Sequence, residues 1–119
     1  MLHAKWLWAL VPVLSTAACA GTPVPAERLA SAEAAIRSAA EVGGDSTPQA
    51  SLHLKMARDQ IAEAKKLIAA GEHERAAATL ARAQIDAELS LSLAREVEAR
   101  EKARALLAEA ERLRSTASH

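Results

Sequence analysis

The sequence predicts an all-α protein: a three-helix antiparallel bundle, or helical hairpin, whose long C-terminal helix overhangs the others as a coiled-coil-like segment. Three observations predict this fold. Ala accounts for 31 of the 119 residues, and helix-favouring residues dominate the chain after residue 25. Gly and Pro punctuate that part only at residues 43–48 and 71, which divides it into three stretches. Within each stretch, apolar residues recur at spacings of three and four.

The first helix is expected at about residues 26–42. Pro25 has the fixed φ that suits a first helical turn, and Glu27 lies near the positive N-terminal end of the helix dipole. Gly43 and Gly44 stop the helix. Its apolar positions at helical spacing are Leu29, Ala32, Ile36, Ala39 and Ala40.

The second helix is expected at about residues 48–70. Ser46 or Thr47 can cap its N-terminus, and Pro48 suits the first turn. Gly71 supplies the turn that follows. Its apolar residues alternate spacings of four and three, which is typical of a coiled-coil seam: Ala50, Leu54, Ala57, Ile61, Ala64 and Ile68.

The third helix is expected at about residues 72–114, because Pro and Gly are absent after Gly71, and residues 115–119 are expected to be a disordered tail. The short turn at Gly71 makes the second and third helices antiparallel neighbours. The seam expected to face the second helix is Ala76, Leu80, Ala83, Ala87, Leu91 and Ala94, while Ala81, Ile85 and Leu89 are expected to meet the first helix.

The third helix is too long for its neighbours. At 1.5 Å per residue it extends roughly 63 Å, against roughly 35 Å for the second helix. Two interpretations remain for its uncovered end: a solvated, salt-bridged helix end, or, as we favour, an interaction surface for a second copy or a partner protein. The residues of that surface are Ala99, Ala103, Leu106, Leu107, Ala110 and Leu113.

The N-terminus predicts export and lipid anchoring. Residues 1–18 have the features of a signal peptide, with Lys5 before a short apolar stretch. Residues 16–19 (Thr-Ala-Ala-Cys) resemble a bacterial lipobox, which implies acyl chains on Cys19 and a short tether over residues 19–25. By resemblance to sorting in Gram-negative bacteria, Ala20 points to the outer membrane, facing the periplasm. The alternative is that Cys19 is an incidental thiol beside an ordinary cleavage site.

The helical part resembles the Ala-rich bacterial lipoproteins of domain of unknown function family 4398. The resemblance covers roughly residues 26–95 and implies no known reaction. The matching stretches are residues 32–36 (Ala-Glu-Ala-Ala-Ile), 47–52 (Thr-Pro-Gln-Ala-Ser-Leu) and 69–76 (Ala-Ala-Gly-Glu-His-Glu-Arg-Ala).

Composition disfavours several function classes. The formal net charge is zero, and the only aromatic residues, Trp6 and Trp8, lie in the expected signal peptide, which argues against a nucleic-acid binder. No motif for a nucleophile, a phosphate loop or a haem is present. His73 between Glu72 and Glu74 is the best metal candidate, but adjacent residues splay apart on a helix. We therefore expect no catalytic, cofactor-binding or metal-binding residues.

The sequence predicts a non-enzymatic, lipid-anchored cell-envelope protein. It is expected to act as a structural or protein-interaction element through its helical hairpin and long C-terminal helix. Expected partners are the membrane, through acyl chains on Cys19, and either a second copy or another envelope protein. The alternative is a soluble, secreted helical bundle that binds a small ligand or a metal, with Cys19 unmodified.

Overall fold

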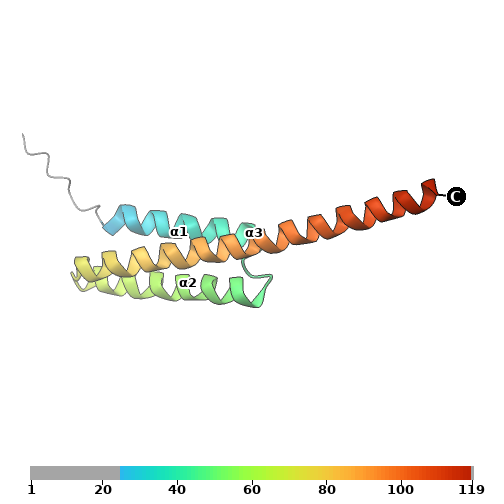
Figure 1. The fold of residues 1–119 in the computed structure, drawn as a ribbon. Coiled ribbons are helices and arrows are strands. Elements are labelled where there is room, and N and C mark those ends of the chain that lie inside the picture. Colours follow the sequence, from blue (N-terminus) through green and yellow to red (C-terminus); the bar gives the residue numbers. More distant parts are fainter. Residues whose placement is uncertain (1–24, 119) are drawn as a thin grey trace, which may run out of the picture.

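The computed structural model describes residues 25–118, so the expected signal peptide and Cys19 lie outside the described residues. Three helices make up this part: α1 is Pro25–Glu41, α2 is Pro48–Ala69 and α3 is His73–Ala117. Both α1 and α3 run in the same direction and α2 runs opposite to them (Figure 1). The predicted all-α fold, a hairpin with a long C-terminal helix, is confirmed.

The ends of α2 follow from local chemistry. Thr47 is the N-cap, because its Oγ1 accepts a hydrogen bond of 3.2 Å from the backbone N–H of Ala50. Ser46 instead donates from Oγ to the carbonyl of Gly43 at 2.5 Å, which holds the turn between α1 and α2. At the other end Gly71 has a φ of +77°, a conformation that other residues rarely adopt, and so turns the chain into α3.

Alanine dominates the contacts between the helices. A central cluster joins Ala32 of α1 and Ile61 of α2 to Leu80 and Ala83 of α3. The α3 seam differs from the expected one at a single position, where Ser90 is buried in place of Leu91; in the same way Leu67 of α2 is buried in place of Ile68. The buried apolar side chains are Ala32, Ala39, Ala50, Leu54, Ala57, Ile61, Ala64, Leu67, Ala76, Leu80, Ala83, Ala87 and Ala94.

Gly44 lies where the loop after α1 passes closest to α3. It is buried, and its N–H donates to the carbonyl of Ala39 at 2.8 Å. A Cβ atom at this position would lie 2.7 Å from Ser90 Oγ and 2.8 Å from the Ala39 carbonyl oxygen. The small Ser90 is therefore buried because a larger side chain would push this loop away from α3.

The expected contact with the first helix is wrong for Ile85 and Leu89, whereas Ala81 is half-buried. Ile85 is 64% exposed and Leu89 is 40% exposed. Leu29 and Ile36 of α1 instead pack against the central cluster that contains Leu80 and Ala83. Helix α1 thus lies on a different side of α3, which leaves Ile85 and Leu89 facing outwards.

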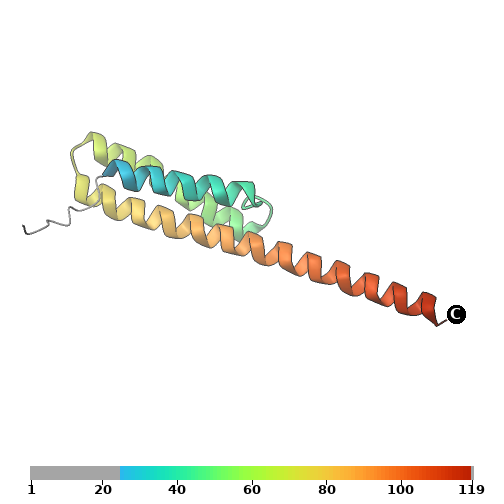
Figure 2. The ribbon, with the colours of Figure 1, turned by 90° about the horizontal axis from the view of Figure 1, so that it is seen from above.

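The expected disordered tail is also wrong as far as residue 117, because α3 continues through Ala117 for a total of 45 residues. Its last buried residue is Ala94, and every described residue from Glu98 onwards is exposed. Residues 98–117, here called the overhang, extend about 30 Å beyond the bundle as a continuation of the same helix (Figure 2).

We expect Gly44→Ala to lower the free energy of unfolding by about 1–3 kcal/mol, because the new methyl group must displace backbone. Urea denaturation followed by circular dichroism measures this change. Ser90→Ala in the same background should restore only part of the loss, since the Ala39 carbonyl contact remains. A Gly44→Ala protein as stable as the parent would show that the loop is not closely packed on α3.

Candidate interaction surface

All six residues of the predicted interaction surface are exposed. The three large ones have the largest uncovered apolar areas of the overhang: Leu106 is 71% exposed, Leu107 is 67% exposed and Leu113 is 55% exposed. Ala99 and Ala103 precede these leucines and Ala110 lies between them on the same face of α3, at spacings of four and three from Ala99 to Leu113. The structure therefore brings the predicted residues together on one uncovered helix face.

This face continues onto the bundle. Counting back from Ala99 by three and four residues reaches Glu96, Ser92, Leu89 and Ile85. The two exposed apolar residues at its start, Ile85 and Leu89, were missed in the sequence because they were assigned to the contact with the first helix. The unbroken alternation of three and four residues between Ile85 and Ala99 could have identified them in the sequence. We call the complete set the outer seam: Ile85, Leu89, Ser92, Glu96, Ala99, Ala103, Leu106, Ala110 and Leu113.

Ion pairs between successive turns accompany the overhang. Arg100 donates to Glu96 at 2.5 Å, Lys102 donates to Glu98 at 2.5 Å, and Arg112 bonds Glu109 through two nitrogens, at 2.9 and 2.6 Å. The partners in each pair are three or four residues apart, which places them on successive turns of the helix. Each such exposed pair stabilises a helix by about 0.2–0.5 kcal/mol.

The carboxylates in two of these pairs are more acidic than usual. The hydrogen bond from Lys102, with its charge, lowers the pKa of Glu98. The hydrogen bond from Arg112 lowers the pKa of Glu109, and that of Arg112 is raised in return. Because the folded-state pKa values of the two carboxyls are lowered, their contribution to helix stability is present at neutral pH. It is lost as the pH falls through those lowered values.

A polar cluster ties α2 to α3. His53 Nδ1 lies 2.9 Å from Asp86 Oδ1, and Gln60 Nε2 donates to Asp86 Oδ2 at 2.8 Å. The side chain of Asp86 is only 15% exposed. The partner of His53 lies 33 residues away on another helix, so no local spacing in the sequence identifies it.

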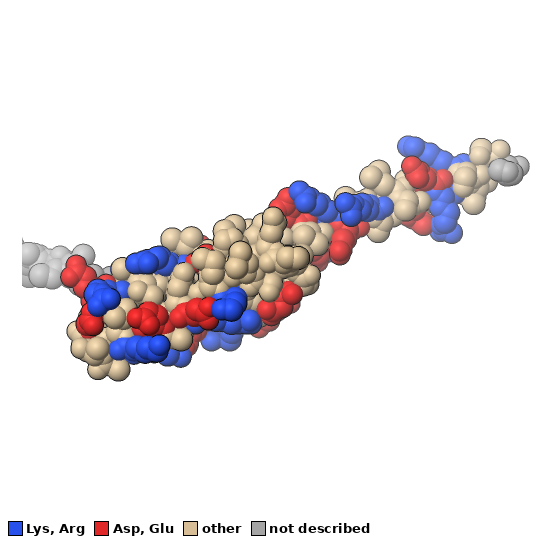
Figure 3. All heavy atoms as spheres, turned by 90° about the horizontal axis from the view of Figure 1, so that it is seen from below, with Lys and Arg blue, Asp and Glu red and all other residues tan. Residues whose placement is uncertain are grey.

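Apolar side chains flank this polar cluster on the outer surface. Leu52 and Met56 occupy the positions one before and three after His53 on α2, and Ile85 and Leu89 occupy the same positions relative to Asp86 on α3. Figure 3 shows a broad area free of acidic and basic side chains on the bundle, next to the point where α3 leaves it. The uncovered apolar surface is therefore not confined to the overhang.

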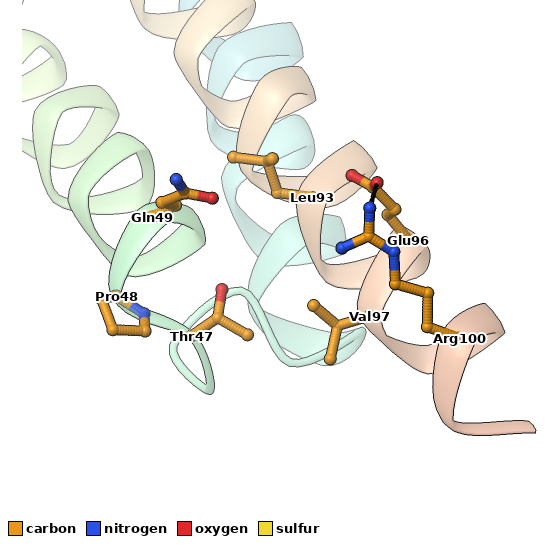
Figure 4. Close-up of a pocket in the computed structure, with 7 residues that line it drawn as sticks. All are labelled: Thr47, Pro48, Gln49, Leu93, Glu96, Val97 and Arg100. Carbon is orange, nitrogen blue, oxygen red and sulfur yellow. Dashed lines mark hydrogen bonds and ion pairs between the residues drawn. The ribbon is translucent and has the colours of Figure 1, made fainter. Parts of the chain in front are cut away.

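A groove of about 330 Å³ lies where α3 separates from the start of α2. Thr47 and Gln49 line one side, and Leu93 and Val97 point towards them from α3 (Figure 4). The ion pair between Glu96 and Arg100 borders its open end. A second hollow, of about 400 Å³, lies between α1 and α2 beside Ile36 and Ile61.

Within residues 25–118, none of the helices is long and apolar enough to cross a membrane. The same residues include no group of three or more His, Cys, Asp or Glu side chains that could hold a metal ion. His73, the metal candidate of the sequence, lies exposed at the start of α3. Cys19, the predicted lipidation site, lies outside the described residues.

No family model matches this chain, and no curated protein or solved structure shows significant similarity to it. The resemblance to the Ala-rich lipoproteins therefore stays a prediction.

We expect Asp86→Ala to lower the free energy of unfolding by about 1–3 kcal/mol, because it leaves His53 and Gln60 without their acceptor in a half-buried site. The matched control is Asp59→Ala, which removes an exposed ion pair with Lys55. Both changes alter intrinsic helix propensity equally, so the difference between them isolates the cluster. Urea denaturation should show a loss of no more than about 0.5 kcal/mol for the control. Equal losses would mean that the cluster does not join the helices.

Proposed function

We propose that this protein is a non-enzymatic, lipid-anchored component of the cell envelope that acts as a structural or protein-interaction element through its long C-terminal helix. The observation that carries the proposal is the overhang itself, where Leu106, Leu107 and Leu113 are each more than half exposed on a helix that no other described segment covers. A helix end that only meets solvent gains nothing from an apolar stripe. Exposed leucines in register are the usual sign of a helix that packs against another.

The geometry of the chain supports anchoring at one end and interaction at the other. Pro25 begins α1 at the end of the bundle opposite to the overhang (Figure 1). A tether from Cys19 to Pro25 spans at most about 20 Å, so an acylated Cys19 keeps that end near the membrane. The tip of α3 lies roughly 60 Å from there along the helix. The interaction surface is thus held away from the anchor.

The groove beside Thr47 favours a second candidate function, a soluble, secreted helical bundle that binds a small ligand. Its volume of about 330 Å³ is at the lower end of the range for ligand pockets. Apolar Leu93 and Val97 with the polar ends of Thr47 and Gln49 are the mixture that such pockets use. In this alternative Cys19 carries no acyl chains.

Mass spectrometry of the mature N-terminus in a bacterial host separates these two candidates. We expect the mature chain to begin at Cys19 and to carry acyl chains, and we expect Cys19→Ala to release the protein from the membrane fraction. A mature chain that begins elsewhere, or an unmodified Cys19, would contradict the lipid anchor and favour the soluble bundle.

The role of the overhang is tested by crosslinking in the intact envelope with the full chain and with a chain that ends after Val97. The described bundle lies before this end, so we expect the truncated chain to keep its anchor and its bundle helicity but to lose its crosslinked product. Ala108→Glu in the full chain is the control, because Ala108 lies on the opposite side of the helix from Leu106 and its neighbours. The same crosslinked product from the full and the truncated chain would show that the overhang is not an interaction surface.

A further inference from the structure

The outer seam has the heptad pattern of one helix in a coiled coil, and it extends over four heptads. Its residues alternate spacings of four and three from Ile85 to Leu113, which places Leu89, Glu96, Ala103 and Ala110 at a positions and the remaining seam residues at d positions. Five of the seven exposed large apolar residues of the described chain belong to α3, and all five lie on this seam or directly beside it. These residues are Ile85, Leu89, Leu106, Leu107 and Leu113.

The two polar residues of the seam are already satisfied within α3. Ser92 Oγ donates to the carbonyl of Glu88 at 3.0 Å. The carboxylate of Glu96 accepts a hydrogen bond of 2.5 Å from Arg100. Both residues therefore keep a hydrogen-bond partner when another helix covers the seam and excludes water.

We propose that the occupant of the outer seam is the same seam of a second copy of this chain, packed antiparallel. The inference rests on the proposed role of the overhang as an interaction surface and specifies its partner. The direction follows from charge. The flanking g positions are Glu88 and Arg95 beside the bundle and Lys102 and Glu109 along the overhang. In antiparallel pairs g positions face g positions, so reversal of one helix can bring Glu109 of one copy to Arg95 of the other.

A parallel pair with the same seam in register places like charges together. Glu96 would face Glu96 of the second copy inside the seam, and Arg95 at a g position would face Arg100 at an e position. Like charges in these positions are destabilising. The antiparallel arrangement avoids both juxtapositions.

One antiparallel register covers the exposed large apolar residues of α3 from Leu89 to Leu113, and it leaves Ile85 opposite Ala117, at the end of the second helix. When Leu89 packs opposite Leu113 of the second copy, Ala99 meets Ala103 beside the symmetry axis, where small side chains allow close approach. The e-position Leu107 then faces Leu93. At the g positions Arg95 faces Glu109, and symmetry produces this pair twice. On the symmetry axis Lys102 faces Lys102 and Arg100 faces Arg100 of the second copy, each once, and these long exposed side chains can turn away into water.

The size of the contact predicts a weak dimer. The seam from Leu89 to Leu113 is about 37 Å long on a helix about 10 Å wide, so the two copies together cover roughly 800 Å². Stable interfaces bury about 1,200–2,000 Å². We therefore expect dissociation in the micromolar range, which confinement at a membrane would offset by raising the local concentration.

Disulfide crosslinking tests the direction and the register. The full chain carries Cys19→Ser, so that the only thiols are those introduced, and Leu89→Cys and Leu113→Cys variants are oxidised separately and as a mixture. We expect the mixture to form a crosslinked dimer and the Leu113→Cys protein alone to form none, because its two copies would lie about 36 Å apart. A dimer from Leu113→Cys alone would overturn the antiparallel arrangement.

Sedimentation of the same Cys19→Ser chain at increasing concentration gives an independent measurement. We expect Arg95→Glu and Glu109→Arg each to weaken dimerisation by about tenfold, and the double variant to restore it. Leu106→Glu should abolish the dimer, whereas Ala108→Glu, with the same added charge on the opposite side of α3, should not. Circular dichroism confirms that each variant keeps its helix.

These measurements are separable from the test of the proposed function. A chain that stays monomeric at all concentrations, yet still needs its overhang to crosslink to a different envelope protein, would overturn the second-copy inference and leave the proposed function standing. A dimer that forms equally well in the Leu106→Glu variant would overturn the inference as well.

Discussion

Nine of the thirteen buried apolar residues in the described chain are alanine, so close approach of the helix backbones, rather than large interlocking side chains, holds the bundle together. A buried methyl group contributes roughly 1 kcal/mol or less, against about 1.5–3 kcal/mol for a buried Leu. The stability of the bundle therefore depends on many small contacts, each sensitive to separation. This explains why the loop at Gly44 meets α3 at a serine, and why a single added methyl group there would push against backbone.

The small size of the buried alanines also explains the polar contacts between the helices. Because alanine keeps the helices close together, polar side chains on either side of the seam can reach one another. Asp86 of α3 reaches both His53 and Gln60 of α2, two turns apart, and Lys65 of α2 reaches Glu33 of α1 at 2.8 Å. The half-buried cluster at Asp86 is the more important of these contacts, since exposed ion pairs contribute little. It helps to fix the register of α2 against α3, because a seam of small alanine side chains defines that register only weakly.

Local signals in the sequence were sufficient for the three helices and for the turns between them, but not for the C-terminal end of α3. Pro48 and Gly71 fix φ, and Thr47 supplies a capping oxygen, so each boundary depends on a few adjacent residues. Local sequence patterns did not reveal which of two neighbouring residues is buried in the seam. Leu91 is the more apolar residue, but the structure buries Ser90 because Gly44, 46 residues earlier, leaves room only for a small side chain.

The candidate surface was predictable in the overhang and not in the bundle. Ala99 to Leu113 have no competing neighbour, so their spacing alone identifies an uncovered stripe. Ile85 and Leu89 have the same spacing, but whether they face α1 or solvent depends on which side of the hairpin α1 occupies, and both sides of α3 offer apolar residues. That choice is made by packing around Leu80 and Ala83, which no local pattern reveals.

The direction of pairing along the outer seam determines how a lipid-anchored dimer would stand on a membrane. In the antiparallel register the N-terminal ends of the two bundles lie roughly 80 Å apart, at opposite ends of the pair. A tether from an acylated Cys19 would reach only about 20 Å, so two such anchors in one membrane would hold both bundles close to its surface and lay the helices along it. A parallel pair would place both anchors at one end and stand upright. The positions of Arg95 and Glu109 on α3 would thus connect the charge pattern of one helix edge to the orientation of the whole assembly.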